Sequence, residues 1–206
     1  GSLNNAKALS EVAKNQQTDP LEVLENIQSY IEVLKKEDGQ KAEAFKSAVM
    51  LLASPNSITL ATNEDIHISA DGQISHSAGD SINISTQKSL IGHASKKISL
   101  FAAQEGARLY AGKGKIEIQA QGDALDLIAR KGVQIISTED IIEFKSPKEI
   151  ILTAGGSQLK INGSGIFSTT GAKFEVKAGQ HLFKPGSSVN ATLNALPQSN
   201  PLKGAL

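Results

Sequence analysis

Histidine is the residue of this chain best suited to bind a metal ion or transfer a proton, and the chain has four of them. Three of these, His67, His93 and His181, fall at positions that we expect to face solvent or lie in turns. His76 differs, because it interrupts a column of apolar residues that is described below. No histidine is placed with matched acids in a strand-helix setting, and no Gly-x-Ser-x-Gly motif precedes a helix, so no hydrolase site is predicted.

Acidic and basic clusters suggest other chemistry, but turns explain them. Asp65, Asp71 and Asp80 could be compared with the acids of β-helical polysaccharide lyases, yet each lies among turn-forming residues. Gly112-Lys113-Gly114 lacks the spacing and the following helix of a phosphate-binding loop. The remaining basic pairs are expected to be solvated: Lys96-Lys97, Lys113-Lys115 and Arg130-Lys131. The sequence therefore predicts neither an enzyme nor a cofactor.

The composition excludes several further classes of function. The 206 residues carry 21 basic and 21 acidic side chains, so no strong field attracts nucleic acid or anionic lipid. Aromatic residues make up only 4%, which suits a narrow core of Ile, Leu and Ala. There is no Cys, which excludes disulfides and leaves the redox compartment open. No apolar run approaches the roughly 20 residues of a membrane span.

A short pattern recurs about fifteen times between residues 58 and 178, and the rest of the chain is organised around it. Each unit has apolar residues at its first and third positions and a small residue at its fifth. We call these positions the first, third and fifth columns. Six units follow one another at a spacing of eight, with Ile58, Ile66, Ile74, Ile82, Leu90 and Ile98 in the first column. Their fifth column is Thr62, Ala70, Ala78, Thr86, Ala94 and Ala102.

Later units keep the three columns at a spacing of eight or nine. They are Ala107-Leu109-Ala111, Ile116-Ile118-Ala120, Leu125-Leu127-Ala129, Val133-Ile135-Ser137, Ile142-Phe144-Ser146, Ile150-Leu152-Ala154, Leu159-Ile161-Gly163 and Phe174-Val176-Ala178. Between Gly163 and Phe174, either Ile166 or Phe167 fits the first column. Alternation with period two predicts strands with one buried face. Turn formers such as Asp71-Gly72-Gln73 and Gly155-Gly156 follow the strands, so the repeat predicts a stacked β-solenoid.

Spacing alone does not decide whether one chain or three build the solenoid. One chain can coil alone, or three identical chains can wind round a common axis and pair their strands across chains. Two features favour three chains: the fifth column is small in every unit, and the short repeat lacks the large side chains that fill a wide single-chain core.

Three runs of the chain resemble the C-terminal β-helix of VgrG proteins: residues 52–58, 115–121 and 150–166. VgrG is the trimeric spike of the bacterial type VI secretion system. The resemblance implies a three-chain triangular β-prism, similar to the needle of contractile phage tails, that punctures a target envelope. It also implies partners: an effector or a PAAR-repeat tip protein at the C-terminal end, and the hub and tail-tube proteins upstream. Such a spike is assembled in the bacterial cytoplasm and then secreted or delivered into the target cell.

Two alternatives stay open beside this interpretation. One is a single-chain β-helix that binds or cleaves polysaccharide. The other is a phage tail-spike needle with the same fold in a different particle. The molecular mass in solution separates the single chain from the trimer.

His76, Gly92 and Ser168 interrupt the third column. In a three-chain needle, parity would bring three His76 imidazoles to one level of the axis, between rings of Ile68 and Ile84. The nitrogens need partners there, which an axial water, a bound anion or a divalent metal such as zinc would supply. His76 is therefore the one candidate metal ligand of the sequence.

The ends of the chain differ from the repeats. Residues 1–54 are expected to hold a tag remnant, Gly1-Ser2, and helices: one near Ala6–Lys14 with Leu9, Val12 and Ala13 on one side, one beginning at Asp19-Pro20, and one over Lys41–Ala53. Residues 55–181 are predicted to form the needle. Residues 182–206 are expected to be irregular and to leave the needle at its far end, where they would bind an effector or tip protein.

Overall fold

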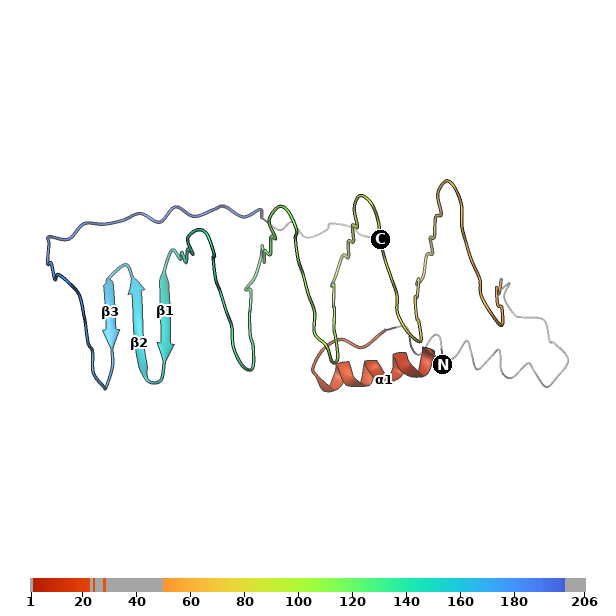
Figure 1. Ribbon diagram of the computed structural model, residues 1–206, viewed down its shortest axis with the longest axis horizontal. Helices are drawn as coiled ribbons and strands as arrows, with labels where there is room; N and C mark the ends of the chain where they lie inside the picture. The colour runs from red at the N-terminus through yellow and green to blue at the C-terminus, as the bar shows by residue number, and fades with distance from the viewer. Residues whose placement is uncertain (1, 23, 25–27, 29–49, 199–206) are drawn as a thin grey trace. The chain divides into compact units, whose positions relative to one another are not determined.

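The computed structural model describes residues 2–22, 24, 28 and 50–198 (Figure 1). The elements whose bounds lie within these residues are the helix α1 (Ser2–Asn15) and the strands β1 (Glu149–Ala154), β2 (Ser157–Asn162) and β3 (Gly165–Thr169). The chain divides into two compact units, Gly1–Lys113 and Gly114–Leu206. No helix of the described residues is both long and apolar enough to cross a membrane.

Helix α1 confirms the first predicted helix and ends in a well-formed C-cap. Gln17 adopts a left-handed conformation with φ of 58°. The Gln17 N–H donates to the Lys14 carbonyl at 2.9 Å, and the Thr18 N–H donates to the Ala13 carbonyl at 2.9 Å. These two bonds form the Schellman motif, which satisfies carbonyls that the helix leaves without partners. Lys14 in the last turn complements the negative end of the helix dipole.

The face that α1 buries includes Ala13 of the predicted set but neither of its two large residues. Leu9 and Val12 are exposed, whereas Ala6, Ser10 and Ala13 are buried. Their spacing of four and three places them on one stripe of the helix. The small side chains let the following segment approach closely, and the Leu21 N–H donates to the Ser10 Oγ at 3.1 Å. Most of the other two predicted helices falls on residues 23, 25–27 and 29–49, outside the described residues. Of the described part, Leu24 and Gln28 are helical, whereas residues 19–22 and 50–53 are not, so the predicted start at Asp19-Pro20 and the predicted end at Ala53 are wrong.

Residues 50–148 run as extended segments joined by bends, and Figure 1 shows them as successive turns within each unit. None of these segments is a hydrogen-bonded strand in the single chain until β1 begins at Glu149. A strand is defined by its ladder to a neighbour, and successive units of one chain do not lie side by side here. The predicted stacked strands are thus absent from the isolated chain, although the alternating, extended conformation is present.

Residues 149–169 depart from the predicted winding and form an antiparallel meander in the order β1-β2-β3. Ile150 pairs with Ile161, Leu152 with Leu159, and Ala154 with Ser157. Between β2 and β3, Ile161 pairs with Ile166 and Leu159 with Ser168. The register therefore gathers the apolar columns of three units on one face of the sheet.

A two-glycine turn causes this departure. Gly155 and Gly156, predicted as a solenoid corner, have φ of 54° and 81°. Two successive residues with positive φ are the mark of a type I′ turn, whose twist reverses the chain into a hairpin. The two adjacent glycines are visible in the sequence, but the regular spacing of the units on either side of them favoured a solenoid that continues to wind.

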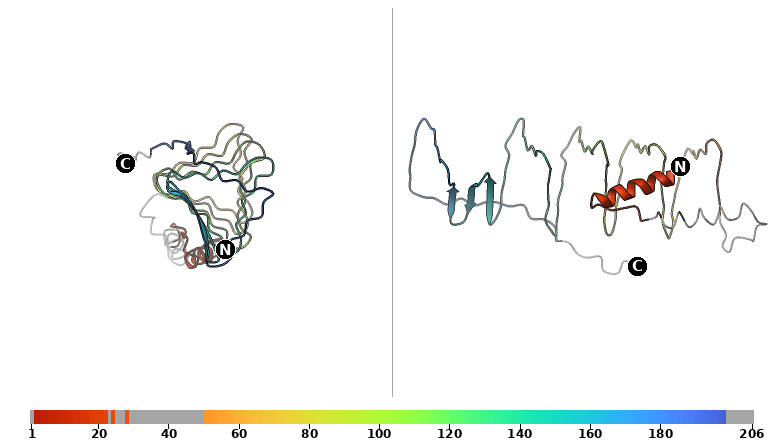
Figure 2. Two further views of the ribbon diagram at one scale, coloured as in Figure 1. Left: turned by 90° about the vertical axis from the view of Figure 1, so that its left-hand side faces the viewer. Right: turned by 90° about the horizontal axis from the view of Figure 1, so that it is seen from below.

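After β3 the chain carries no further helix or strand through residue 198. Residues 182–198 run back past β3, β2 and β1 in both Figure 1 and Figure 2, instead of leaving the unit at its far end as predicted. Leu193 and Leu196 are about half exposed, whereas Phe183 is fully exposed. Residues 199–206, the remainder of the predicted tail, lie outside the described residues.

Candidate functional site

Polar side chains on the extended segments confirm which face of each unit carries the columns. In an extended chain, residues two apart lie on the same face. Side-chain pairs two residues apart recur on the face opposite the columns. They are Lys115–Glu117 at 2.7 Å, Glu143–Lys145 at 3.0 Å, Glu175–Lys177 at 2.9 Å and Gln119–Gln121 at 3.3 Å. His67 and Asp65, 3.8 Å apart, follow the same pattern. The polar face is thus continuous with solvent, as the alternation predicted.

The fifth column has a role that the sequence analysis missed. In four units a fifth-column hydroxyl accepts the backbone N–H two residues further along and closes the bend, and in a fifth unit the Ser137 Oγ accepts the Asp140 N–H, three residues along, at 3.1 Å. The four pairs are Thr62 with Glu64 at 3.1 Å, Thr86 with Lys88 at 3.4 Å, Ser146 with Lys148 at 3.2 Å and Thr170 with Ala172 at 3.0 Å. These are hydroxyl turns, which fix a bend without glycine. The alternation of Thr, Ser and Ala in this column was the available signal.

The same hydroxyl turn settles the phase between Gly163 and Phe174. Ile166 faces Ile161 in the register, and Thr170, four residues later, closes its bend as other fifth-column residues do. Ile166, Ser168 and Thr170 are therefore the columns of this unit. Phe167 lies on the opposite, polar face of the sheet.

In the part of the chain that the structure describes, the apolar columns form an extended surface without a partner. Among the described residues only Ala6, Ser10 and Ala13 are buried, and column residues such as Ile118 and Ile135 are 62% and 57% exposed. The chain has 21103 Å² of accessible surface, whereas a compact monomer of its mass has roughly 9,000 Å². So much exposed apolar surface marks an interaction surface.

The backbone of the same segments also lacks partners within the chain. Outside α1 and the three strands, the backbone-to-backbone hydrogen bonds of the described residues all lie at the end of α1. Residues 50–148, leaving Gln73 aside, therefore have extended backbone without a ladder in this chain. Backbone N–H and C=O groups that end up buried need partners, so this surface calls for another chain that offers both apolar side chains and strand edges.

The candidate metal ligand His76 is exposed in the single chain, like the columns around it. Within the described residues, no group of three or more His, Asp or Glu side chains is placed to hold a metal ion. One chain contributes one imidazole at that level, so the three-fold ring stays a prediction. Gly92 has open space beside its Cα, and Ser168 lies on the apolar face opposite Leu159.

One ion pair joins the end of the α1 segment to a bend of the repeats. The Lys97 Nζ lies 2.9 Å from the Asp19 Oδ1. The hydrogen bond from Lys97, followed by one with Ser99, lowers the pKa of Asp19. The same bond to Asp19 raises the pKa of Lys97. Lys97, predicted to be a solvated base, is 66% exposed and also contacts the N-terminal segment through Asp19.

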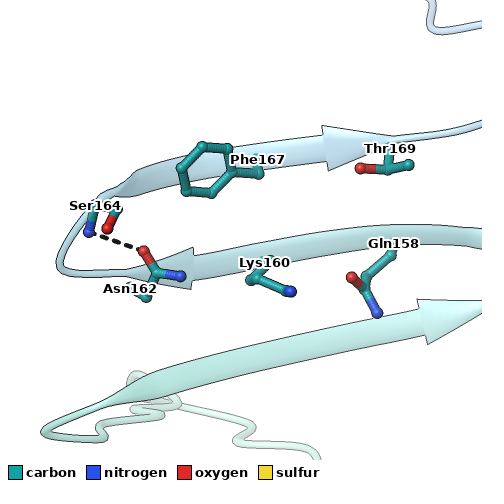
Figure 3. Close-up of a pocket in the computed structure, with 6 residues that line it drawn as sticks. All are labelled: Gln158, Lys160, Asn162, Ser164, Phe167 and Thr169. Atoms are coloured by element: carbon teal, nitrogen blue, oxygen red, sulfur yellow. Dashed lines mark hydrogen bonds between the residues drawn. The ribbon is translucent and has the colours of Figure 1, made fainter.

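A shallow pocket of about 430 Å³ lies on the polar face of β2 and β3 (Figure 3). We call it the outer pocket. Its lining residues are Gln158, Lys160, Asn162, Ser164, Phe167 and Thr169. Strand alternation puts the three β2 residues on one face, and the register sets Lys160 beside Phe167 and Gln158 beside Thr169. The sequence analysis named none of these as site residues.

The walls of the outer pocket are held by their own hydrogen bonds. The Asn162 Nδ2 donates to the Glu149 Oε1 at 3.0 Å, and the Asn162 Oδ1 accepts the Ser164 N–H at 2.8 Å. The Gln158 Nε2 donates to the Thr153 Oγ1 at 3.0 Å. Gly165, at the start of β3, has a φ of 145°, which residues with a side chain rarely adopt, and a Cβ there would lie in ordinary contact with the Phe167 ring, 3.4 Å from its Cζ.

Comparison with known proteins agrees with the architecture. A VgrG spike from the type VI secretion system with the Tle1 effector bound superposes with a TM-score of 0.74 at 22% identity, over 86% of this chain and 52% of that chain. The VgrG spike from the type VI secretion system superposes with a TM-score of 0.72 at 23% identity, over 85% of this chain and 64% of that chain. The chain thus spans less than two thirds of the length of either structure. None of the curated proteins matches the chain.

These superpositions confirm the resemblance to the VgrG spike at the level of the fold. A family model described as "Uncharacterized protein conserved in bacteria (DUF2345)" matches residues 37–187, which is most of the chain and all of its repeats. The chain belongs to the DUF2345 family.

Proposed function

We propose that the chain is the needle segment of a type VI secretion spike, a homotrimer in which about fifteen units of each chain wind round a common axis as a triangular β-prism. The observation that carries this proposal is the coincidence of exposed apolar columns with extended backbone that forms no ladder over residues 50–148, Gln73 being left aside. Two further copies would cover the columns and supply the missing ladders at once. The VgrG fold supports the same arrangement.

In this trimer the mechanism is mechanical. Ladders between chains leave few free strand edges, so bending or unwinding the needle breaks many hydrogen bonds together. A needle of this construction transmits the force of a contracting tail to the envelope it punctures. No step of this function requires a catalytic residue.

The partners follow from the same assignment. One of the similar VgrG spikes has the Tle1 effector bound, which supports an effector as cargo of this chain too. A PAAR-repeat tip protein would bind at the C-terminal end, and hub and tail-tube proteins would lie upstream. The complete particle would be assembled in the bacterial cytoplasm and would leave the cell when it fires.

The single-chain polysaccharide β-helix fits the structure less well. A β-helix of one chain forms its parallel ladders between its own successive turns, and residues 50–148 form none among the described residues, Gln73 being left aside. A phage tail-spike needle has the same construction as the proposed trimer, and only the particle in which the chain is found separates the two.

Light scattering coupled to gel filtration tests the proposal. Three copies of the 21.6 kDa chain have a mass of about 65 kDa, and one copy keeps 21.6 kDa. Folding should also depend on protein concentration, because the monomer has almost no core of its own. A folded, β-rich monomer at micromolar concentration would contradict the proposal.

A further inference from the structure

The outer pocket contains a cation without a partner. Lys160 is half-buried in the middle of β2, and among the described residues its ammonium group forms neither an ion pair nor a hydrogen bond. The carboxylate on the same face, Glu149, is already bound by the Asn162 amide. Other lysines of the polar face, such as Lys115 and Lys145, are paired with glutamates. Lys160 is thus free to bind an anionic group that enters the pocket.

Phe167 places an aromatic ring on this otherwise polar face. Its ring is 46% exposed and stands beside Lys160 in the register, as Figure 3 shows. An aromatic ring with an accessible face suits the C–H side of a pyranose, which is apolar and slightly positive where the ring is negative. The ring lies next to Gly165.

The remaining groups suit hydroxyls. The Gln158 Nε2 is used by Thr153, but its Oε1 is left to accept a hydrogen bond, and the Ser164 and Thr169 hydroxyls also line the pocket. The volume of about 430 Å³ matches one or two sugar rings. The polar wall, the aromatic ring and the single free cation of the pocket together suit a ligand that has hydroxyls, an apolar face and a negative charge.

We propose that the outer pocket binds a sugar that carries a carboxylate, as in the acidic polysaccharides of cell envelopes. The carboxylate binds the Lys160 ammonium group, the ring of the sugar packs on Phe167, and its hydroxyls contact Gln158 and Thr169. This site goes beyond the needle function but rests on it in one respect. The trimer covers the apolar face of the β1-β2-β3 sheet, which leaves the pocket on the outside and repeats it three times.

Isothermal titration of the full chain with trigalacturonate tests the proposal, with maltotriose as the neutral control of the same length. A shallow site of this kind should bind trigalacturonate with a Kd on the order of 1 mM, and maltotriose at least fivefold more weakly. Raising the salt from about 20 to 150 mM should weaken binding of the acidic sugar only. Equal affinity for both sugars would overturn the proposal. So would the absence of any heat of binding when the trigalacturonate concentration reaches about 20 mM.

Lys160→Gln should weaken trigalacturonate binding at least fivefold and leave maltotriose unchanged. The matched control is Lys145→Gln, which removes a lysine of the same face that is already paired with Glu143 at 3.0 Å, and should change the Kd less than twofold. Phe167→Ser should weaken the binding of both sugars. The masses of the unmodified chain and of each variant are measured first: an unmodified trimer that binds no sugar refutes the pocket alone, and an unmodified chain that stays a folded monomer refutes the needle.

Discussion

At the scale of single residues, the hydroxyls of the fifth column are the least expected feature of the chain. A small residue was predicted there for reasons of space, and Ala satisfies that requirement as well as Thr. The structure adds a second reason, because Thr and Ser accept a backbone N–H and hold the bend. A bend without glycine restricts the unfolded chain as well as the folded one.

Thr62→Val removes one such acceptor while keeping the shape of the side chain. The Glu64 N–H loses its partner at 3.1 Å, and the cost should be about 1 kcal/mol per chain, or roughly 2–4 °C in Tm. Thr59→Val in the same unit is the control, because Thr59 lies on the polar face. Thermal melting followed by circular dichroism measures both. If the two variants have the same Tm, the hydroxyl turn contributes nothing to stability.

The Asp19–Lys97 pair predicts how pH acts on the attachment of the N-terminal segment. The pKa of Asp19 is lowered, so its contribution is present above its ordinary value of 3.8 and is lost as pH falls through the lowered value. The pKa of Lys97 is raised, so its contribution is present below 10.5 and is lost as pH rises through the raised value. The contact should therefore be strongest between about pH 4 and pH 10.

Amide hydrogen exchange of residues 2–22 at pH 7 measures this contact. Lys97→Met should speed exchange in that segment, and high salt should have a similar effect because both groups are exposed to solvent. Lys96→Met removes the neighbouring charge without breaking the pair and should leave exchange unchanged. Equal exchange in both variants would show that the pair does not hold the segment.

At the scale of elements, the sequence predicted conformation better than pairing. Alternation identified the extended units and their polar face, because burial of one face imposes period two on any strand. It did not identify the β1-β2-β3 meander, since a column pattern looks the same whether the next strand winds onward or turns back. At the β1–β2 turn, the conformation of Gly155 and Gly156, both with positive φ, separates these cases. The outer pocket was missed for the same reason, because antiparallel pairing is what brings Lys160 beside Phe167.

The Gly155-Gly156 turn gives a test of the meander. Gly156→Ala should destabilise the protein by about 1 kcal/mol per chain, because Ala does not readily adopt φ of 81°. No side chain blocks the position, so the effect comes from the backbone alone. Gly155→Asn creates the Asn-Gly sequence that type I′ turns favour and should leave Tm unchanged or raise it. Equal losses in both variants would argue against a type I′ hairpin here.

At the scale of the whole molecule, the apolar columns form a core only if several chains bury them against one another. Ile118→Asp would place three carboxylates at one level of the proposed core, where charge has no partner. The trimer and the circular dichroism signal of β-structure should then be lost together at micromolar concentration. Gln119→Asp, one residue along on the polar face, should assemble normally. Light scattering and circular dichroism decide it, and a folded monomer of Ile118→Asp would refute the interlocked assembly.

His76 tests the same assembly from inside its axis. In the trimer three imidazoles would interrupt a column that is apolar above and below, at Ile68 and Ile84, and polar rings in such layers cost free energy unless something binds them. With a chelator present, His76→Leu should therefore raise the free energy of unfolding by about 1 kcal/mol per chain. His67→Leu is the matched control, since His67 lies on the polar face beside Asp65, and it should not change stability. Added zinc that raises the Tm of the unmodified chain but not of His76→Leu would identify the ring as a metal site. If both leucine variants behave alike, His76 does not face the axis, and the parity of that unit is wrong.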